Sequence, residues 1–183
     1  MTIFSIFVIM KQKRKIELDF IVDKLTNSIE NAITGDIFDT EIIQLSVKNF
    51  KEIISNDWLF DWKQEIRNKS KEVYKLTIKN NAQIIQGLIS YEDKGDHLFM
   101  HLIESAKFNK GKIKIYLGIP GNLVAFACQQ SFMKGYGGYV SFISKSKLIE
   151  HYSDTLGAKV LFANTMIIET SAALKLIHKY YNK

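Results

Sequence analysis

A glycine turn between a lysine-rich loop and an apolar segment is the feature of this sequence best suited to bind a ligand. The stretch 104–128 (ESAKFNKGKIKIYLGIPGNLVAFAC) has the pattern of a strand end, a basic loop, a turn from Gly118 to Gly121 and the start of a helix. The first N–H groups of a helix have no partner within it, and the helix dipole favours negative charge there. The pattern therefore predicts a site for a phosphate-bearing ligand.

Length and composition indicate one globular domain. The chain has 183 residues, of which 46% are hydrophobic and 24% charged, and these values are ordinary for a folded domain. Its one cysteine, Cys128, excludes an internal disulfide framework and a multi-cysteine metal site, and we expect a reducing, cytoplasmic setting. We expect residues 1–15 to be a tail and residues 16–183 to form a single domain.

The charge and the N-terminal stretch point weakly to function. The net charge of +6 is spread along the chain rather than gathered in one block, so a nucleic-acid partner is not expected. The apolar run at 2–10 is too short to span a bilayer and has its basic cluster, residues 11–15, on the side opposite to that of a signal peptide. We expect no membrane association. A short edge strand and a start at Met10 remain alternatives for this stretch.

The next stretch is expected to form a wall of mixed structure from 16 to 72. Residues 16–33 carry apolar side chains near helical spacing, although 16–22 also alternates as a strand would. A turn at 34–36 and a short strand within 38–45 follow, and Ser46 is placed to cap a helix that ends at Ile54.

An aromatic trio marks the end of this wall. Trp58, Phe60 and Trp62 occupy alternate positions, and residues 63–72 are mostly charged. Aromatic side chains bury large areas, so core or pocket wall is preferred over a stacking platform for bases.

A β-rich core is predicted from residue 73. Residues 73–91 favour a β-hairpin with its turn at Asn80-Asn81, and 97–105 predicts a third strand. Regular alternation would place Leu98, Met100 and Leu102 on one face of that strand and Phe99, His101 and Ile103 on the other.

Helices and strands then alternate to the end of the chain. An apolar helix after Gly121 should lie against a sheet and end near Gly135. A buried strand within 139–144, a helix capped by Ser146 and ended by Gly157, one bent strand or two within 158–169, and a last amphipathic helix follow. The fold class is α+β, with a mixed, mostly antiparallel sheet flanked by helices.

This order resembles the Gcn5-related N-acetyltransferase (GNAT) fold over residues 73–169. Three stretches carry the resemblance: 105–112, the turn from Gly118 to Leu123 with its helix, and 149–158, where Tyr152 precedes a Leu-Gly turn. The turn is similar to the loop that binds the pyrophosphate of acyl-CoA in that family. Pro120 stands where the family usually has glycine and lacks an N–H, while Gly121, Asn122 and Leu123 would keep theirs for an anion.

The resemblance implies acetyl-CoA as co-substrate and an amine as acceptor. The residues it implies for acetyl-CoA binding are Ile103, Tyr116, Gly118, Ile119, Gly121, Asn122 and Leu123.

The resemblance also implies general acid–base help for acetyl transfer. Tyr152 would be the acid that protonates the departing thiolate, or else a packed core-edge tyrosine. Glu104, at the end of a strand where the sheet would open, would be the base, or else a solvated strand end. His97 and His101 are alternative bases, His151 should point away from Tyr152, and Cys128 should be inert packing. No metal-ligand pattern is expected.

Three functions stay open from the sequence. The first is an acetyl-CoA-dependent N-acetyltransferase, with the stretch 58–62 in one wall of the acceptor site. The second is a non-catalytic binding module of the same fold, for which Pro120 argues. The third, a nucleic-acid-associated protein, depends on net charge alone and would show binding that falls steeply with salt. The acceptor and the oligomeric state are not encoded in any recognisable pattern.

Overall fold

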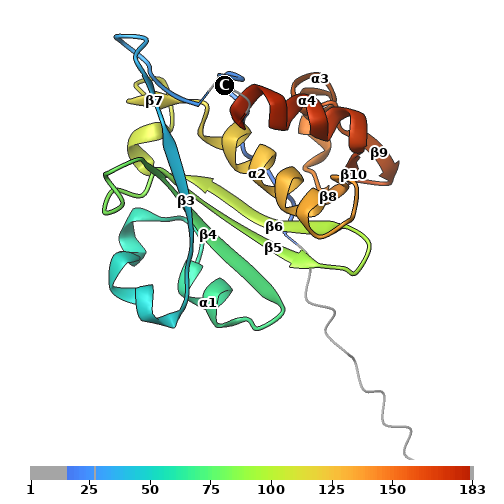
Figure 1. Cartoon of the computed structure of the whole chain (residues 1–183), viewed down its shortest axis with the longest axis horizontal. Coiled ribbons are helices and arrows are strands. Elements are labelled where there is room, and N and C mark those ends of the chain that lie inside the picture. The colour runs from blue at the N-terminus through green and yellow to red at the C-terminus, as the bar shows by residue number, and fades with distance from the viewer. Residues whose placement is uncertain (1–15, 27, 182–183) are drawn as a thin grey trace, which may run out of the picture.

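The structure is a computed structural model that describes residues 16–26 and 28–181. The expected N-terminal tail, 1–15, lies outside the described residues. A mixed sheet forms the centre, with helices α2 and α4 on one face and α1 on the other (Figure 1). The expected α+β class is confirmed.

Within the described residues, seven strands form the main sheet in the order β3-β4-β5-β6-β8-β10-β9. Each neighbouring pair is antiparallel except β6 and β8, which are parallel. The strands are β3 (Thr40–Gln44), β4 (Lys71–Ile78), β5 (Gly87–Asp93), β6 (Leu98–Ser105), β8 (Val140–Ile143), β9 (Lys159–Phe162) and β10 (Thr165–Ile168).

The predicted hairpin is confirmed as β4 and β5. Asn80 has a φ of 67°, the left-handed conformation that asparagine tolerates in turns. The second strand begins at Gly87 rather than at 82, because the first residues after the turn form a loop.

The parallel junction between β6 and β8 is short, and it opens the cleft in which the site lies. The two strands pair at Leu98–Val140 and Phe99–Ser141, whereas β6 continues to Ser105 and β8 to Ile143. Beyond the junction the strands therefore diverge, as a sheet does when no further ladder bonds hold it together.

A β-bulge in β6 changes the faces expected from simple alternation. Tyr91 pairs with Met100 and Ser90 with Leu102, so His101 is an extra residue without a counterpart on β5. The prediction that Leu102 shares a face with Leu98 and Met100 is wrong. The prediction that Ile103 shares a face with Phe99 is also wrong. Leu98, Met100 and Ile103 lie in the core under α2, and Leu102 lies in the opposite core.

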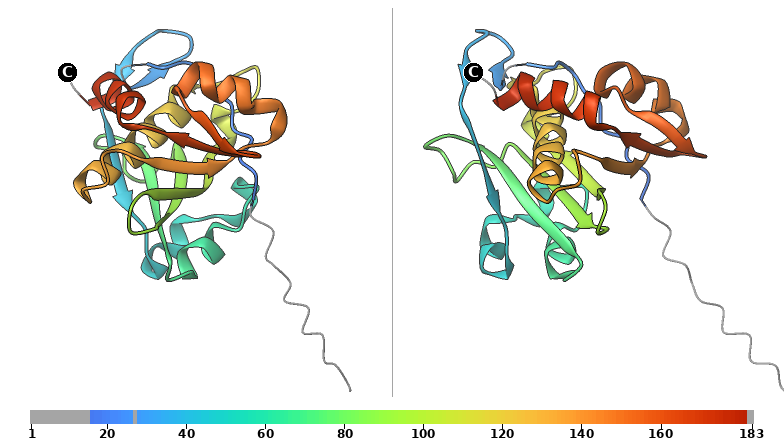
Figure 2. Two further views of the ribbon diagram at one scale, coloured as in Figure 1. Left: turned by 90° about the vertical axis from the view of Figure 1, so that its right-hand side faces the viewer. Right: turned by 45° about the vertical axis from the view of Figure 1, so that its right-hand side comes forward.

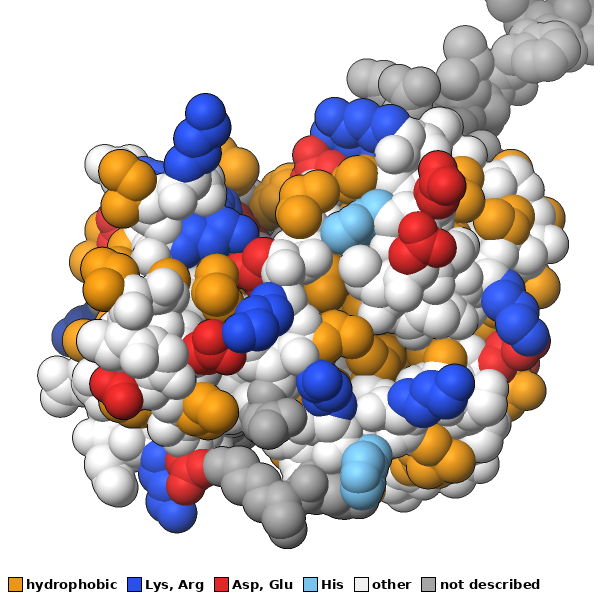
Figure 3. Space-filling view, turned by 90° about the horizontal axis from the view of Figure 1, so that it is seen from above, with side chains coloured by type: hydrophobic (Ala, Val, Ile, Leu, Met, Phe, Trp, Pro, Cys, Tyr) orange, Lys and Arg blue, Asp and Glu red, His pale blue; other side chains and the backbone are white. Residues whose placement is uncertain are grey.

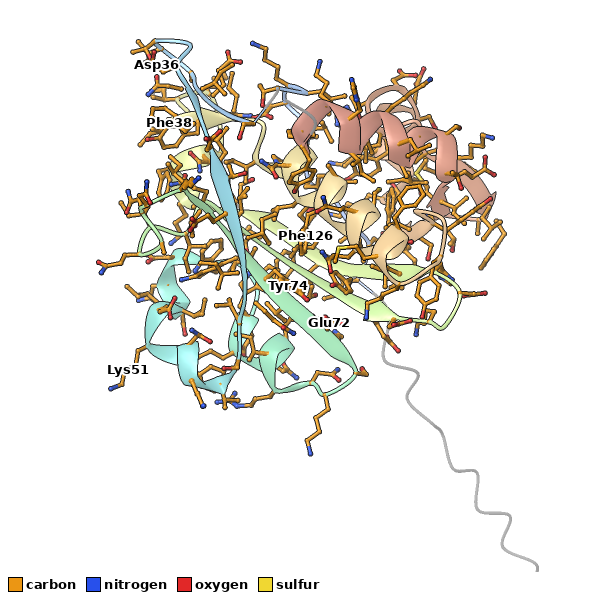
Figure 4. The ribbon with its side chains drawn as sticks, viewed as in Figure 1. Asp36, Phe38, Lys51, Glu72, Tyr74 and Phe126 are labelled. Atoms are coloured by element: carbon orange, nitrogen blue, oxygen red, sulfur yellow. The ribbon has the colours of Figure 1, made fainter. Side chains whose placement is uncertain are left out.

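Helix α2 (Ile119–Met133) packs on the sheet because it is apolar on nearly all sides. Tyr74 of β4 meets Phe126 of α2 at 4.8 Å between ring centroids with an interplanar angle of 62°, and Figure 4 shows the two side chains between strand and helix. Gly135, with φ +83°, follows the helix end as predicted.

A second core lies on the other face of the sheet. Trp58 and Trp62 are 9% and 1% exposed and pack edge to face with 6.4 Å between ring centroids. The core interpretation of this aromatic trio is confirmed for the two tryptophans. The six-residue helix α1 (Trp62–Arg67), capped by the Asp61 side chain, was missed because half of its residues are charged and it is short.

The region from 16 to 31 is not helical in the described residues. Residues 17–26, called the N-terminal segment below, form no helix and one isolated β-bridge, at Leu18, and β1 (Ile29–Asn31) follows. β1 pairs with β2 (Ile37–Phe38) and with β7 (Tyr116–Leu117) in a small sheet beside the glycine turn. The helical alternative is wrong: Leu18, Val22 and Ile29 are buried, whereas Ile21 and Ile33, which a helix would place near them, are exposed.

Two predicted helix caps have different outcomes. Ser46 does cap a helix, but it is a 3₁₀ helix over Val47–Glu52. Ser146 is not a cap: it is the first residue of a 3₁₀ turn, and α3 (Ile149–Leu156) begins without a side-chain cap. Gly157, with φ +65°, ends α3 as expected.

The C-terminal region completes the sheet. The stretch 158–169 forms two strands, β9 and β10, and α4 (Thr170–Tyr181) packs against α2 (Figure 2). β9 is an exposed edge strand.

Candidate active site

The cleft between β6 and β8 is occupied by the N-terminal segment of the same chain. Leu18 forms a parallel bridge with Ser144: its N–H donates to Ile143 O at 2.6 Å, and its carbonyl accepts from Lys145 N–H at 3.0 Å. Figure 2 shows the segment as a blue trace alongside the C-terminal part of the chain. The segment thus continues the sheet where β6 has left β8.

Tyr152 of α3 points into this cleft. Its side chain is fully buried, and its hydroxyl donates to Phe20 O at 2.8 Å. The rings of Tyr152 and Phe20 pack with 4.9 Å between their centroids. Burial raises the pKa of Tyr152 well above its ordinary value, and the nearby Asp19 carboxylate adds to the shift. The phenol therefore keeps its proton at neutral pH, as a proton donor must, although it is a weaker acid than an ordinary tyrosine.

His151 lies at the same cleft, so the prediction that it points away is wrong. Its Nε2 accepts a hydrogen bond from Val22 N–H at 3.0 Å. Nε2 must then be unprotonated, which places the proton of the neutral ring on Nδ1. Both His151 and Tyr152 reach the N-terminal segment because it passes along α3 for several residues.

The glycine turn precedes α2 as predicted, and an aspartate of the N-terminal segment already contacts it. Gly118 has φ +86°, a left-handed conformation suited to glycine, and its N–H donates to Asp23 Oδ1 at 3.1 Å. Lys114 pairs with the other oxygen of the same carboxylate at 3.0 Å. The turn and its lysine therefore bind a negative group in this structure, and that group belongs to the chain.

The remaining donors of the turn are fewer than expected. Asn122 N–H donates to Gly118 O at 3.0 Å, so the prediction that it is open to an anion is wrong. The Asn122 side chain is also engaged, with Thr40 Oγ1 at 3.3 Å and Tyr181 Oη at 3.1 Å. Pro120 lies in the first turn of α2, where a missing N–H costs no helical bond.

The other residues expected to bind acetyl-CoA at the loop pack against neighbouring side chains and backbone. Ile119 and Leu123 are 1% and 0% exposed and cover Gly87 of β5, where a Cβ would lie 2.6 Å from Ile119 Cγ2. Tyr116 packs against Phe38 at 5.8 Å between ring centroids. Gly121 faces Leu25 and the hydroxyl of Tyr180, so a side chain there would collide with both.

Glu104 is buried rather than solvated, and both its oxygens accept hydrogen bonds. Oε1 accepts from Leu59 N at 2.8 Å and from Lys110 Nζ at 2.6 Å; Oε2 accepts from Trp62 Nε1 at 2.8 Å and from Phe60 N at 3.4 Å. The bulge at His101 places Glu104 on this face of β6. The carboxylate fixes the stretch 59–62 against the strand.

A cavity of about 430 Å³ lies between the N-terminal segment and this wall, a size suited to a small ligand. Phe20, Phe60, Ile103, Glu104 and Pro120 are among its lining residues. Pro120 is the residue of the turn that lines this cavity together with Glu104; Tyr152 does not line it, and its hydroxyl bonds to Phe20, which does.

The alternative bases lie elsewhere. His97 Nδ1 contacts Asp96 at 2.6 Å at the exposed end of the sheet. His101 Nε2 contacts Glu92 at 2.8 Å, and burial lowers its pKa in spite of that carboxylate. Neither residue lines the cavity.

Cys128 is fully buried in α2, and burial raises the pKa of its thiol, which agrees with inert packing. In the described part of the chain, no group of three or more His, Cys, Asp or Glu side chains could hold a metal ion. Among the helices described, none is long and apolar enough to cross a membrane.

The sequence pointed to the turn, to Tyr152 and to Glu104, but it missed the partners that contact them. Phe20, Asp23 and Lys114 were not singled out, although Lys114 lies in the basic loop. The only signal for Asp23 was a carboxylate within an apolar stretch of ambiguous type, and no local pattern connects it to Gly118, 95 positions later.

No protein-family model matches this sequence, and a comparison with curated proteins likewise finds no match. Solved structures do match. A chain of the KacTA–DNA complex aligns with a TM-score of 0.53 at 12% identity, covering 75% of this chain and 98% of that one. A mutant form of the spermidine/spermine N-acetyltransferase SpeG from Vibrio cholerae aligns with a TM-score of 0.51 at 14% identity, covering 74% and 96%.

These matches define the fold. The described chain has the acyl-CoA N-acyltransferase fold of the GNAT superfamily, and the resemblance stated from the sequence is confirmed at that level. Both neighbours are almost fully covered while this chain is not, so it carries residues that they lack.

Proposed function

We propose that this protein is an acetyl-CoA-dependent N-acetyltransferase that acts on an amine. The observation that carries the proposal is the position of Tyr152, whose buried hydroxyl points into the cleft where β6 and β8 diverge. The glycine turn with Lys114, which already contacts a carboxylate, supports an anionic ligand at the other end of the cleft.

In the proposed reaction the acceptor amine attacks the acetyl carbonyl of acetyl-CoA. A C–N bond forms, the C–S bond breaks, the amine loses a proton to a base, and Tyr152 gives its proton to the departing thiolate. Its raised pKa means that Tyr152 is protonated before the step and readily regains a proton afterwards.

Glu104 is the proposed base. Each of its oxygens already accepts two hydrogen bonds, so we propose that the longest of them, from Phe60 N–H at 3.4 Å, gives way to a water of the cavity, through which Glu104 receives the proton. The stretch 59–62, which Glu104 holds in place, would form one wall of the acceptor site.

The second candidate is a non-catalytic module of the same fold, and the filled cleft together with Pro120 favours it. A nucleic-acid role has less support: on the face seen in Figure 3, lysine and arginine side chains are interspersed with acidic ones, and charge is the sole basis of that hypothesis. The neighbour in a DNA complex shares 12% identity, which shows the fold alone.

A thermal shift assay with acetyl-CoA and with free CoA distinguishes the first two candidates. A ligand that binds the native state alone must raise the unfolding midpoint. Transfer is then followed by release of the CoA thiol, first with spermidine as a trial acceptor because one structural neighbour is a spermidine/spermine acetyltransferase. Cys128 is fully buried and adds no background to a thiol assay. The enzyme hypothesis is rejected if neither the wild type nor Asp23→Asn, which removes the charge that pairs with Lys114, shows a midpoint shift at millimolar acetyl-CoA.

A further inference from the structure

We propose that the N-terminal segment, residues 17–26, is an autoinhibitory element that occupies the acyl-CoA site in place of the ligand and must leave before acyl-CoA binds. The inference rests on the proposed function and concerns regulation of the same site. It is carried by three separate contacts along the segment, of which the first and third use groups assigned above to the reaction with acyl-CoA.

The first contact is electrostatic. Acyl-CoA carries a pyrophosphate, and the proposed receptor for it is the Gly118 N–H with the Lys114 ammonium. Both groups bind the Asp23 carboxylate instead, at 3.1 and 3.0 Å. The Asp23 side chain is 10% exposed, so it lies in the turn rather than on the surface.

The second contact involves the backbone. The pantetheine arm of acyl-CoA contains two amide groups, which match the hydrogen bonding of a polypeptide. Leu18 N–H bonds to Ile143 O of β8, Leu18 O accepts from Lys145 N–H just after that strand, and Val22 N–H bonds to His151. The segment therefore uses strand and helix groups that an amide-bearing arm in this cleft would need.

The third contact is at the proposed acid. The Tyr152 hydroxyl has one proton to donate, and it donates it to Phe20 O at 2.8 Å. While this bond exists, the hydroxyl has no proton to give to a thiolate. Binding of the segment and productive binding of acyl-CoA therefore exclude each other.

The segment is held by these contacts and by burial of Leu18 and Val22, which are 3% and 5% exposed, and it forms no helix or ladder of its own. A state with the segment displaced is needed for binding, so the apparent affinity for acyl-CoA is reduced by the fraction of molecules in which that state is populated. Anything that stabilises or loosens the segment would then regulate the enzyme.

A covalent crosslink between the N-terminal segment and the residues that follow β8 tests directly whether the segment must leave before acyl-CoA binds. Asp19 and Lys145 form an ion pair at 2.5 Å, with side chains 46% and 42% exposed. In the double variant Asp19→Cys/Lys145→Cys, a short thiol-reactive crosslinker would join the two positions, while the buried Cys128 does not react. The same variant with each thiol blocked by a monofunctional reagent is the matched control.

We expect the blocked variant to bind CoA, measured by calorimetry, and the crosslinked variant to bind at least about tenfold more weakly. Equal affinities in the two forms would overturn the inference and leave the proposed function intact, since CoA would then bind beside the segment, for example through the 430 Å³ cavity.

Hydrogen exchange is a second measurement, and it shows which residues move when CoA binds. On addition of CoA to the wild-type chain, the amides of Leu18 and Val22 should lose protection from hydrogen exchange, because displacement of the segment separates them from Ile143 O and His151. Unchanged protection at saturating CoA would contradict displacement.

Asp23→Asn removes the charge that pairs with Lys114 and should tighten CoA binding about fivefold or more. Asp154→Asn, at an exposed position of α3, changes net charge equally and should leave the affinity unchanged. If wild type, Asp23→Asn and the blocked cysteine variant all fail to bind CoA, the proposed function fails and the inference fails with it.

Discussion

The Tyr152 hydroxyl donates a hydrogen bond of 2.8 Å to the carbonyl oxygen of Phe20, a residue 132 positions earlier in the chain. This bond connects the proposed acid of an acetyl transfer to a segment that fills the cleft of the same fold. Tyr152 is therefore both the candidate catalytic group and a latch for the segment, and substitutions there should affect both roles.

Replacing Tyr152 with phenylalanine separates these roles. Loss of the acid should lower acetyl transfer by about 10²-fold or more, while loss of one buried hydrogen bond should lower the free energy of unfolding by about 1 kcal/mol. CoA affinity should not fall, because the hydroxyl has no role in holding the pyrophosphate. Steady-state kinetics, urea unfolding and calorimetry measure the three quantities, and unchanged turnover would remove Tyr152 from the acid role.

Alkaline pH should destabilise the protein through Tyr152. Its folded-state pKa lies above the ordinary value near about 10, so both states are protonated below that pH and the unfolded state ionises first above it. The free energy of unfolding should therefore fall as pH rises above about 10.

Tyr91 and Tyr180 have pKa values raised in the same direction by burial and contribute to the same decline. The variant Tyr152→Phe should lose stability less steeply than wild type, and urea unfolding at a series of alkaline pH values measures the difference. Parallel curves for the two proteins would show that Tyr152 ionises equally in both states.

Replacing Glu104 with glutamine tests whether Glu104 acts as the base or only supports the structure around it. The substitution keeps the shape but leaves Lys110 without its buried anionic partner, and we expect a loss of about 2 kcal/mol in the free energy of unfolding. Lys110→Met breaks the same ion pair and keeps the carboxylate.

If Glu104 is the base, turnover should fall by about 10²-fold in Glu104→Gln and much less in Lys110→Met. Similar turnover losses in both variants would assign Glu104 a supporting role only. Rates are compared at a temperature where both variants are folded.

Gly118→Ala and Gly95→Ala form a matched pair. Both glycines have φ +86°, so alanine costs about 1 kcal/mol of backbone strain at either position. At Gly95 nothing lies within 4 Å of the new Cβ, whereas at Gly118 it would meet Thr26 Oγ1 and, at 2.6 Å, Ser28 O.

We therefore expect Gly118→Ala to lower the unfolding midpoint clearly more than Gly95→Ala. Equal midpoints would show that residues 26 and 28 shift away from the turn at little cost. Thermal unfolding followed by circular dichroism gives both values.

Local pattern was enough to predict much of the fold. The hairpin β4–β5, the apolar helix α2 and the glycine ends at Gly135 and Gly157 each depend on neighbours within one or two turns of chain. The bulge at His101 was not predictable, because one extra residue leaves the hydrophobic alternation of the sequence intact while it reverses the faces beyond it.

The site was predicted only in part for the same reason. Glu104 and Tyr152 stood out by their place in the order of elements, but their partners, Trp62 and Phe20, lie 42 and 132 positions away. The conformation of a segment that fills a cleft depends on the cleft, and the local pattern of residues 16–33 favoured a helix, with strand alternation over 16–22 as the alternative.

The short junction of β6 with β8 makes the cleft the weakest line of hydrogen bonding in the described sheet. Two ladder positions join its two halves, whereas the β5–β6 pair alone has seven. Opening the cleft for a ligand therefore requires few backbone hydrogen bonds to break. The strands on either side can remain intact while acyl-CoA replaces the N-terminal segment between them.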